Sequence, residues 1–272
     1  MRYEVGIVAR WMDARMRVVD VAYTADGAEV PARMYLPDHL SSPAPAVLLC
    51  AGRLREIEGL EFLAFACLRL GMAVLACPYR GMDMRTDDVD CMAGLDFLGT
   101  QEDVDADRML MVGHSRGAMA SLRVAAQDER VRAVVALQPV TDFVRYVEAT
   151  RDYAPIRYGH LIQSLGATPE EDRSRYEALS ALPRAVDIKI PVLLVAGTMD
   201  LHSPADHSVW MHRALVTAGN ADTHLEILDG VGHFFEHMYG GYVQEQITEL
   251  VTAWLRSRIT NTVTHSSTQE AT

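Results

Sequence analysis

Short apolar runs alternate with helical stretches along most of this 272-residue chain, and that alternation limits the folds open to it. A run that is apolar at consecutive positions is typical of a strand buried on both faces, as in a parallel sheet. We therefore predict an α/β fold, with a mostly parallel, twisted sheet covered by helices on both faces. The predicted core strands are 43–52, 72–80, 109–115, 131–139, 191–197 and 223–230, and the predicted helices are 62–71, 86–100, 116–127, 206–219 and 242–259.

The remaining segments are the two ends and one long interruption of the alternation. Residues 18–36 are predicted as two strands around a tight turn. Residues 140–190 are polar, rich in aromatic side chains and broken by prolines, so we predict an inserted helical cap. Residues 1–17 could form a helix, a strand or a partner-binding arm, and 259–272 are predicted to be disordered. The predicted globular domain is therefore 18–258.

The net charge and the positions of the cysteines limit which binding partners and which cellular compartment we expect. The net charge of -12 and the pI near 5.2 argue against binding of nucleic acid and against a polybasic contact with a membrane. Cys50, Cys67, Cys77 and Cys91 lie in apolar stretches with no CxxC pair, so we expect buried, reduced thiols. No segment has transmembrane length and the N-terminus lacks a signal-peptide run, so we expect a cytoplasmic protein. Trp11 and the N-terminal arm could pair two copies into a homodimer.

The segment MVGHSRGAMA (111–120) places a serine between two glycines at a predicted strand-to-helix joint. Gly113 to Gly117 fit the G-x-S-x-G pattern, in which a sharp turn needs small residues two positions either side of the serine. Such a turn holds the Ser115 hydroxyl near a helix N-terminus, where backbone N–H groups can stabilise a developing negative charge. The alternative is an ordinary tight turn that merely needs small residues. We predict that Ser115 is a nucleophile.

A serine nucleophile needs a base to take its proton and an acid to orient that base. Asp200 follows the predicted strand 191–197, and His233 follows the last predicted strand in a Gly-x-Gly-His loop. The chain order Ser115, Asp200, His233 is that of the α/β-hydrolase fold. Asp206, the rival acid, lies further into the next predicted helix, where a first-turn acid is common. Other histidines have other expected places: His114 as a packed support, His202, His207 and His212 on helix surfaces or loops, His224 at a strand, and His237 beyond the loop.

Two further features concern the oxyanion and a metal. The backbone N–H of Arg116 is one expected oxyanion donor, and the N–H of Arg53 is the candidate for the second by its position in the loop 50–56. His233-Phe-Phe-Glu-His237 also fits H-x-x-E-H, but that zinc signature needs both histidines on one helix face, whereas glycines make the approach a loop. We therefore expect no metal and no cofactor.

Four stretches resemble the α/β-hydrolase superfamily, and more narrowly the catalytic domain of prolyl-oligopeptidase-type serine hydrolases and dienelactone-hydrolase-like esterases. AYTADGAEVPARMYLPDHLSSPAPAVLLCAG is similar to the strands that lead to the oxyanion loop, and CPYRGMD to the Tyr-Arg-Gly segment that follows the next strand. DVDADRMLMVGHSRG resembles the nucleophile elbow, and IKIPVLLVAGTMD resembles the strand that carries the acid. The resemblance covers about residues 18–256. It implies acyl transfer from an ester, amide or peptide to water, with Ser115, Asp200 and His233 as the triad.

The chain departs from that pattern at Ala51-Gly52-Arg53, where many relatives have His-Gly-Gly or a tyrosine. About forty residues precede the first core strand, too few for the β-propeller of large oligopeptidases. A carboxylesterase acting on a small ester or amide is therefore favoured over a peptidase. Acyl transfer or cyclisation by the same nucleophile, and a binding protein without activity, stay open. The pocket candidates are Leu54, His114, Phe143, Tyr146, Tyr153 and Tyr158.

Overall fold

An eight-stranded sheet forms the centre of the computed structural model, which describes residues 16–38, 43–235 and 241–260. The strands are β1 (Met16–Ala25), β2 (Ala28–Pro37), β3 (Ala44–Cys50), β4 (Ala73–Cys77), β5 (Val104–His114), β6 (Val131–Leu137), β7 (Val192–Gly197) and β8 (Thr223–Leu228). Their order in the sheet is β1-β2-β4-β3-β5-β6-β7-β8. Strand β2 runs antiparallel to both of its neighbours, and all the other pairs are parallel.

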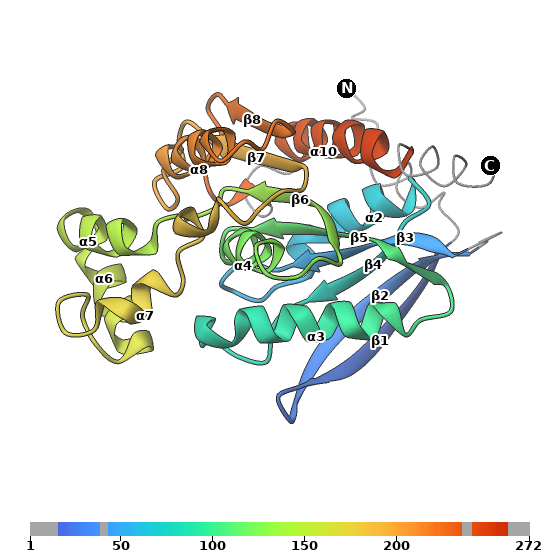
Figure 1. Cartoon of the computed structure of the whole chain (residues 1–272), viewed down its shortest axis with the longest axis horizontal. Coiled ribbons are helices and arrows are strands. Elements are labelled where there is room, and N and C mark those ends of the chain that lie inside the picture. The colour runs from blue at the N-terminus through green and yellow to red at the C-terminus, as the bar shows by residue number, and fades with distance from the viewer. Residues whose placement is uncertain (1–15, 39–42, 236–240, 261–272) are drawn as a thin grey trace, which may run out of the picture.

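Helices cover both faces of this sheet (Figure 1). Outside the cap, these helices are α2 (Glu61–Leu68), α3 (Asp87–Gly99), α4 (Arg116–Ala125), α8 (Asp206–Thr217) and α10 (Tyr242–Thr260), with 3-10 turns η1 (Glu58–Leu60) and η2 (Met84–Thr86). Apolar side chains of α2 and α10 pack on one face, and those of α3, α4 and α8 pack on the other. The predicted α/β architecture is confirmed.

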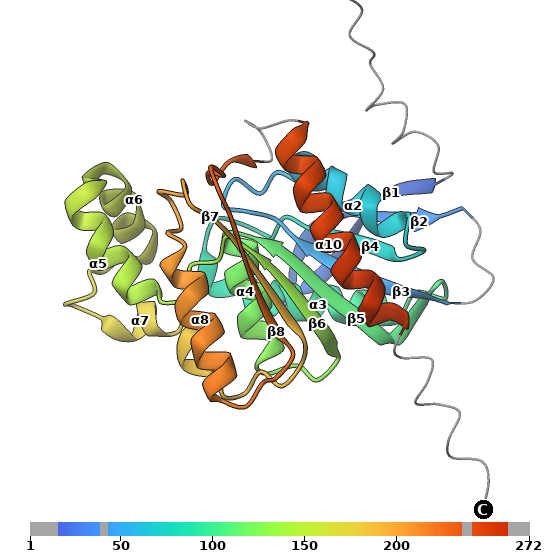
Figure 2. The same cartoon turned by 90° about the horizontal axis from the view of Figure 1, so that it is seen from above.

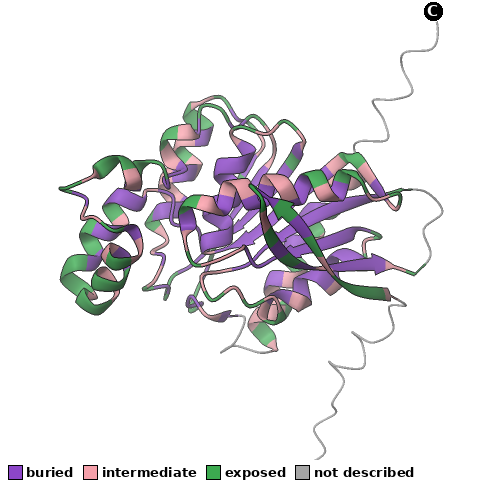
Figure 3. Cartoon of the chain, turned by 90° about the horizontal axis from the view of Figure 1, so that it is seen from below, coloured by how far each residue is buried: buried purple, intermediate pink, exposed green. Residues whose placement is uncertain are grey.

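The buried strands explain why the sequence folds this way. Every residue of β3, β4 and β7 is buried, as their uninterrupted apolar runs predict (Figure 3). Strand β1 lies at the edge of the sheet, where Val18 and Val19 are 45% and 41% exposed. The carboxyl ends of the parallel strands β3, β5, β6, β7 and β8 meet at one edge of the sheet, so the loops that follow them can share a site.

The segment between β6 and β7 is helical, as predicted. It contains α5 (Phe143–Tyr153), α6 (Pro155–Leu165), α7 (Arg173–Glu177) and the 3-10 turn η3 (Leu182–Arg184). These cap helices lie to one side of the sheet, beyond α8 (Figure 2). They bury an apolar cluster of their own that includes Val147, Leu165 and Tyr176, and this cluster reaches Met84 of η2 and Met119 of α4.

The boundaries differ from the sequence prediction at a few places. Strand β5 begins at Val104 rather than at residue 109, because Val104 already pairs with Ala44 on β3. Strand β1 begins at Met16, inside the predicted arm, and α10 reaches Thr260, past the predicted domain end. The N-terminal arm with Trp11, and the predicted tail beyond residue 260, lie outside the described residues. Within the described part of the chain, no helix is both long and apolar enough to cross a membrane.

Candidate active site

Ser115 lies at the joint between β5 and α4, in a backbone conformation that few non-glycine residues adopt. Its φ is 53° and its ψ is -112°. Such a conformation costs about 1–3 kcal/mol and persists only where the surrounding structure enforces it. Here the Ser115 N–H donates to Leu137 O on β6 at 2.8 Å, which fixes the turn against the neighbouring strand. The hydroxyl is therefore held clear of the sheet, at the N-terminus of a helix.

The two glycines of the motif are required by close backbone contacts. A Cβ atom on Gly113 would lie 2.3 Å from Gly117 O. A Cβ atom on Gly117 would lie 2.1 Å from Cys50 O, at the end of β3. Both distances are far below any real carbon–oxygen contact, so a side chain at either position would force the turn away from the sheet. The structure thus shows the sharp, crowded turn that the two glycines of G-x-S-x-G predict.

Three loops bring Ser115, His233 and Asp200 together. His233 Nε2 lies 2.9 Å from Ser115 Oγ, and His233 Nδ1 lies 2.8 Å from Asp200 Oδ2. The other carboxylate oxygen of Asp200 accepts from the N–H of His202 at 2.8 Å and from that of Ser203 at 2.7 Å. Asp200 is thus fixed by two N–H groups of its own loop and by the imidazole, and it is 4% exposed.

The rival acid lies elsewhere. Asp206 is the first residue of α8, as its helix-terminus interpretation predicts. The H-x-x-E-H pattern, from which no metal site was expected, includes Glu236 and His237, which lie outside the described residues. Its remaining member, His233, is engaged on both ring nitrogens by Ser115 and Asp200.

Two further imidazoles flank His233. The ring of His202 stacks on that of His233 with centroids 5.2 Å apart, and the ring of His114 lies 5.0 Å away on a tilt. Burial and the neighbouring His233 lower the pKa of His114 to about 3. Burial, then Arg157 and His233, lower the pKa of His202 to about 4. Both flanking rings are therefore neutral at physiological pH, so they do not compete with His233 for a proton.

His114 acts as the packed support that its place in the motif predicts. Its Nε2 lies 3.1 Å from Gln138 Oε1 and 3.2 Å from the backbone oxygen of His233. Both of these atoms are acceptors, so Nε2 carries the hydrogen. Gln138 in turn donates to Gly232 O at 2.7 Å. This chain of bonds fixes the loop that carries His233 against the end of β5.

Two histidines of the segment after β7 have roles that the sequence did not predict. His202 was expected on a surface or a loop; it lies on the loop after β7, but it borders the site. The prediction of a surface position for His207 is wrong, because His207 is 4% exposed and its Nδ1 accepts from the N–H groups of Thr141 and Asp142, both at 3.3 Å. It thus joins α8 to the start of the cap. Nothing local in HSPADH distinguishes these residues from a solvated helix start.

The predicted oxyanion donors both border the site. Among the described residues, neither the Arg53 N–H nor the Arg116 N–H donates to a backbone carbonyl outside the helices and strands. The Arg116 N–H lies in the first turn of α4, where amides have no acceptor within the helix. Arg53 lies in the loop after β3, and Arg116 is the first residue of α4. Both residues line the same cavity as Ser115.

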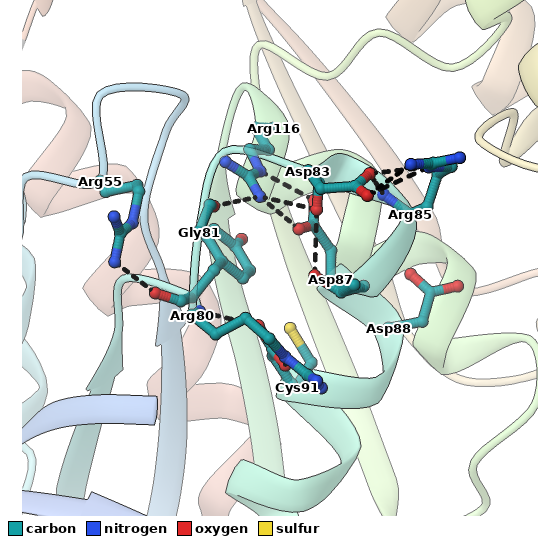
Figure 4. Close-up of polar contacts among 12 residues, drawn as sticks. Arg55, Arg80, Gly81, Asp83, Arg85, Asp87, Asp88, Cys91 and Arg116 are labelled. Atoms are coloured by element: carbon teal, nitrogen blue, oxygen red, sulfur yellow. Dashed lines mark hydrogen bonds and ion pairs between the residues drawn. The ribbon is translucent and has the colours of Figure 1, made fainter. Parts of the chain in front are cut away.

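The Arg116 side chain is buried and joins the start of α4 to the segment 81–87 (Figure 4). Its guanidinium binds the Asp87 carboxylate through two bonds of 2.8 and 2.5 Å and donates to Gly81 O at 3.0 Å. It also lies 4.4 Å from the centroid of the Tyr79 ring. Burial raises the pKa of the Asp87 carboxyl to about 6 against the opposing effect of Arg116. The sequence analysis singled out the nearby Tyr-Arg-Gly segment. Nothing in the sequence indicated that Asp87 would be the partner of Arg116.

A cavity of about 240 Å³ opens onto Ser115 and His233 beneath the cap. Four of the predicted pocket residues line it: Leu54, His114, Phe143 and Tyr146. The apolar part of its wall also includes Leu60, Met84, Met119, Val140, Leu161 and Phe234, and charged side chains border it as well. The cavity therefore suits a small substrate with a largely apolar body.

Two predicted pocket residues do not line this cavity. Tyr153 is 49% exposed, near the end of α5. The Arg151 guanidinium lies 5.1 Å from the centroid of the Tyr158 ring, which is partly buried against the apolar cluster of the cap. Prediction from aromatic composition fails here because the helix phase decides which aromatic side chains face the cavity.

Comparison with known proteins agrees with this geometry. The sequence model of the prolyl oligopeptidase family matches residues 67–262. The chain belongs to the prolyl oligopeptidase family. Membership makes it a hydrolase of ester or amide bonds with the α/β-hydrolase fold, and it confirms the family resemblance seen in the sequence. An uncharacterised protein of Mycobacterium tuberculosis (strain ATCC 25618 / H37Rv) is 27% identical over 230 residues, which cover 82% of this chain and 74% of that protein.

Solved structures share the fold of this family member. Acylaminoacyl peptidase of Pyrococcus horikoshii superposes with a TM-score of 0.78 at 15% identity, over 95% of this chain but only 44% of the peptidase. Est1E from Butyrivibrio proteoclasticus superposes with a TM-score of 0.71 at 18% identity, over 89% of this chain and 99% of Est1E. The chain thus spans less than half of the peptidase and nearly all of Est1E.

Proposed function

We propose that this chain is a serine carboxylesterase acting on small esters, with Ser115 as nucleophile, His233 as general base and Asp200 as the residue that orients the imidazole. The observation that carries the proposal is the continuous set of hydrogen bonds from Asp200 through His233 to Ser115, at the wall of a cavity. Each member of that set has the partner its role requires.

The proposed reaction proceeds in two halves. Ser115 Oγ attacks the carbonyl carbon while His233 Nε2 takes the hydroxyl proton, and a tetrahedral oxyanion forms. His233 then gives that proton to the leaving alkoxide, and the acyl group stays on Ser115. In the second half a water attacks the acyl-enzyme, His233 takes its proton and returns it to Ser115 Oγ, and the acid leaves. Asp200 stabilises the imidazolium in both halves through Nδ1.

The backbone amides of Arg116 and Arg53 are the proposed oxyanion donors. Both residues line the cavity together with Ser115, and neither amide donates to a backbone carbonyl outside the helices and strands among the described residues. Loss of one such donor typically costs about 10²- to 10³-fold in kcat. The Arg116 amide is held in place by the buried bonds of its own side chain to Asp87.

Ester hydrolysis is favoured by the small volume of the cavity, about 240 Å³ under a helical cap, which leaves little room for an extended peptide. The similarity to Est1E along nearly its whole length also supports an esterase. A second candidate is removal of an acyl group from an amino acid, an amide cleavage, because the fold match to acylaminoacyl peptidase is close. We also propose a cytoplasmic location, because the four cysteines are buried and unbridged, which suits a reducing compartment.

A matched pair of substrates tests the proposal. We expect p-nitrophenyl butyrate to be hydrolysed with a kcat/KM well above that of butyryl-p-nitroanilide, and Ser115→Ala to abolish turnover of both. A preference for N-acetyl-alanine-p-nitroanilide would favour the amide candidate. Product analysis in the presence of a competing alcohol detects acyl transfer, which the proposal excludes as the main outcome. An unchanged rate in Ser115→Ala would refute the assigned nucleophile.

A further inference from the structure

The cavity wall carries an excess of positive charge in a protein whose net charge is -12. The charged residues along it are Arg53, Arg55, Glu56, Arg116 and Arg157. Arg116 is neutralised by Asp87, and Arg55 donates to the backbone oxygens of Pro78 and Tyr79. Arg53, Arg55 and Arg157 have no carboxylate partner among the described residues, although Glu56 lies on the same wall. Because Arg55 is held by backbone oxygens, Arg53 and Arg157 are the two guanidinium groups left to bind a ligand.

Arg157 comes from α6 of the cap and has only neutral partners among the described residues. Its Nη2 lies 3.0 Å from His202 Nε2, and its Nη1 lies 3.5 Å from the Tyr146 hydroxyl. A guanidinium stays protonated in proteins, so His202 must accept that bond with an unprotonated Nε2. The guanidinium therefore touches an imidazole that is stacked on His233, one ring away from the base of the reaction.

Arg53 approaches the same point from the loop after β3. Burial raises the pKa of the Tyr146 hydroxyl, while Arg157 and Arg53 both act to lower it. The Tyr146 side chain is partly buried, Arg157 contacts its hydroxyl, and Arg53 lines the same cavity. No ion pair joins either arginine to a carboxylate in the part of the chain that the structure describes.

The other arginines of the cap show that this arrangement is unusual. Four of these five form an ion pair with a carboxylate, namely Arg145, Arg151, Arg173 and Arg175; Arg184, in η3, has none among the described residues. A cation in a partly buried wall is stabilised when an anion supplies matching charge and hydrogen bonds. A planar guanidinium matches a carboxylate, which can bind through two parallel hydrogen bonds.

We propose that the substrate carries a free carboxylate in addition to its scissile ester, and that Arg157, with Arg53, binds this carboxylate. The apolar wall of Leu60, Met119 and Leu161 would hold the carbon chain between the two groups. The inference rests on the proposed esterase function for its kinetic test. Arg157 is then a specificity-determining residue that the cap brings to the site, and the substrate class is half-esters of small dicarboxylic acids or esters of comparable anionic acids.

The kinetic test compares two esters of equal chain length, the mono-p-nitrophenyl ester of adipic acid and p-nitrophenyl hexanoate. We expect the wild type to favour the adipate ester. Arg157→Gln should lower the ratio of the two kcat/KM values by about 10- to 100-fold, as loss of a hydrogen bond to a charged group typically does. Arg151→Gln is the matched control, because Arg151 lies on the cap but pairs with Glu170 away from the cavity. That control should leave the ratio unchanged.

A binding measurement separates this inference from the proposed function. Calorimetric titration of adipate into Ser115→Ala needs no catalysis. We expect binding that weakens at least tenfold when Arg157→Gln is added and that does not change with Arg151→Gln. Equal ratios in wild type and Arg157→Gln, or adipate binding that is insensitive to Arg157, would overturn the anion site. Failure of wild type to hydrolyse either ester would instead contradict the esterase proposal, and the titration would still decide on the anion site.

Discussion

Loss of the Asp87 carboxylate should destabilise the protein strongly, because it would leave a buried cation without its partner. The Arg116 and Asp87 side chains are 2% and 1% exposed, and their two bonds are 2.8 and 2.5 Å long. Removal of one member of a buried pair typically costs about 3–5 kcal/mol. In Asp87→Asn, Arg116 would keep its bond to Gly81 O and its place over the Tyr79 ring. We therefore expect a loss near the lower end, about 3 kcal/mol in the free energy of unfolding.

The assay is urea unfolding at pH 8, where Asp87 is ionised because its pKa is about 6. A stability change should lower the midpoint without a change in m. The control is Arg85→Gln, which removes a pair to Asp83 in the same region whose side chains are 49% and 39% exposed (Figure 4). Exposed pairs contribute little, so the control should change stability hardly at all.

The double variant Asp87→Leu/Arg116→Met completes the test. Replacement of both charges by apolar groups of similar size is often neutral, so we expect it to recover most of the stability lost in Asp87→Asn. The backbone N–H at position 116 stays in place, so the double variant should keep esterase activity. A loss below about 1 kcal/mol in Asp87→Asn would refute the view that this pair supports the elbow.

Three further predictions concern the turn, the acid and the buried histidine. Gly117→Ala should abolish activity and lower the melting temperature, because its Cβ would lie 2.1 Å from Cys50 O; a folded variant with wild-type turnover would contradict the packing described. Asp200→Asn should lower kcat by about 10³- to 10⁴-fold with little change in KM, as measured by ester hydrolysis, since the imidazole would lose its orienting partner. Burial lowers the folded-state pKa of His207 to about 4, below the unfolded value near 6.5, so the unfolded state binds the proton more readily. The stability from His207 is therefore present above pH 6.5 and lost as the pH falls toward 4; His207→Asn, which keeps an acceptor, should show a shallower decline in urea midpoint over that window, and an equal decline would refute this assignment.

The strands and the elbow could be predicted because their signals are local. Burial on both faces leaves an uninterrupted apolar run in β3 and β7, and the contact of Gly117 with the end of β3 leaves a glycine at a fixed distance from Ser115. Chain order then assigned Asp200 and His233, since each follows a core strand. These features need no knowledge of how distant segments meet.

The rest of the site depends on contacts between segments far apart in the sequence. Arg157 reaches His202 across 45 positions, and Arg116 reaches Asp87 across 29. Neither pair has a local pattern, because any surface arginine or first-turn aspartate looks the same in the sequence. The wrong placement of Tyr153 has a similar cause: its position in the turn of α5 is set by packing against the domain.

The central claim is that Ser115 is a nucleophile activated by His233, and labelling with a fluorophosphonate probe tests it most directly. We expect mass spectrometry of the digested wild-type protein to locate one adduct, on Ser115. His233→Ala should slow the labelling by orders of magnitude, while His212→Ala, on α8 and outside the cavity lining, should label at the wild-type rate. An adduct on another residue, or equally fast labelling without His233, would contradict the account.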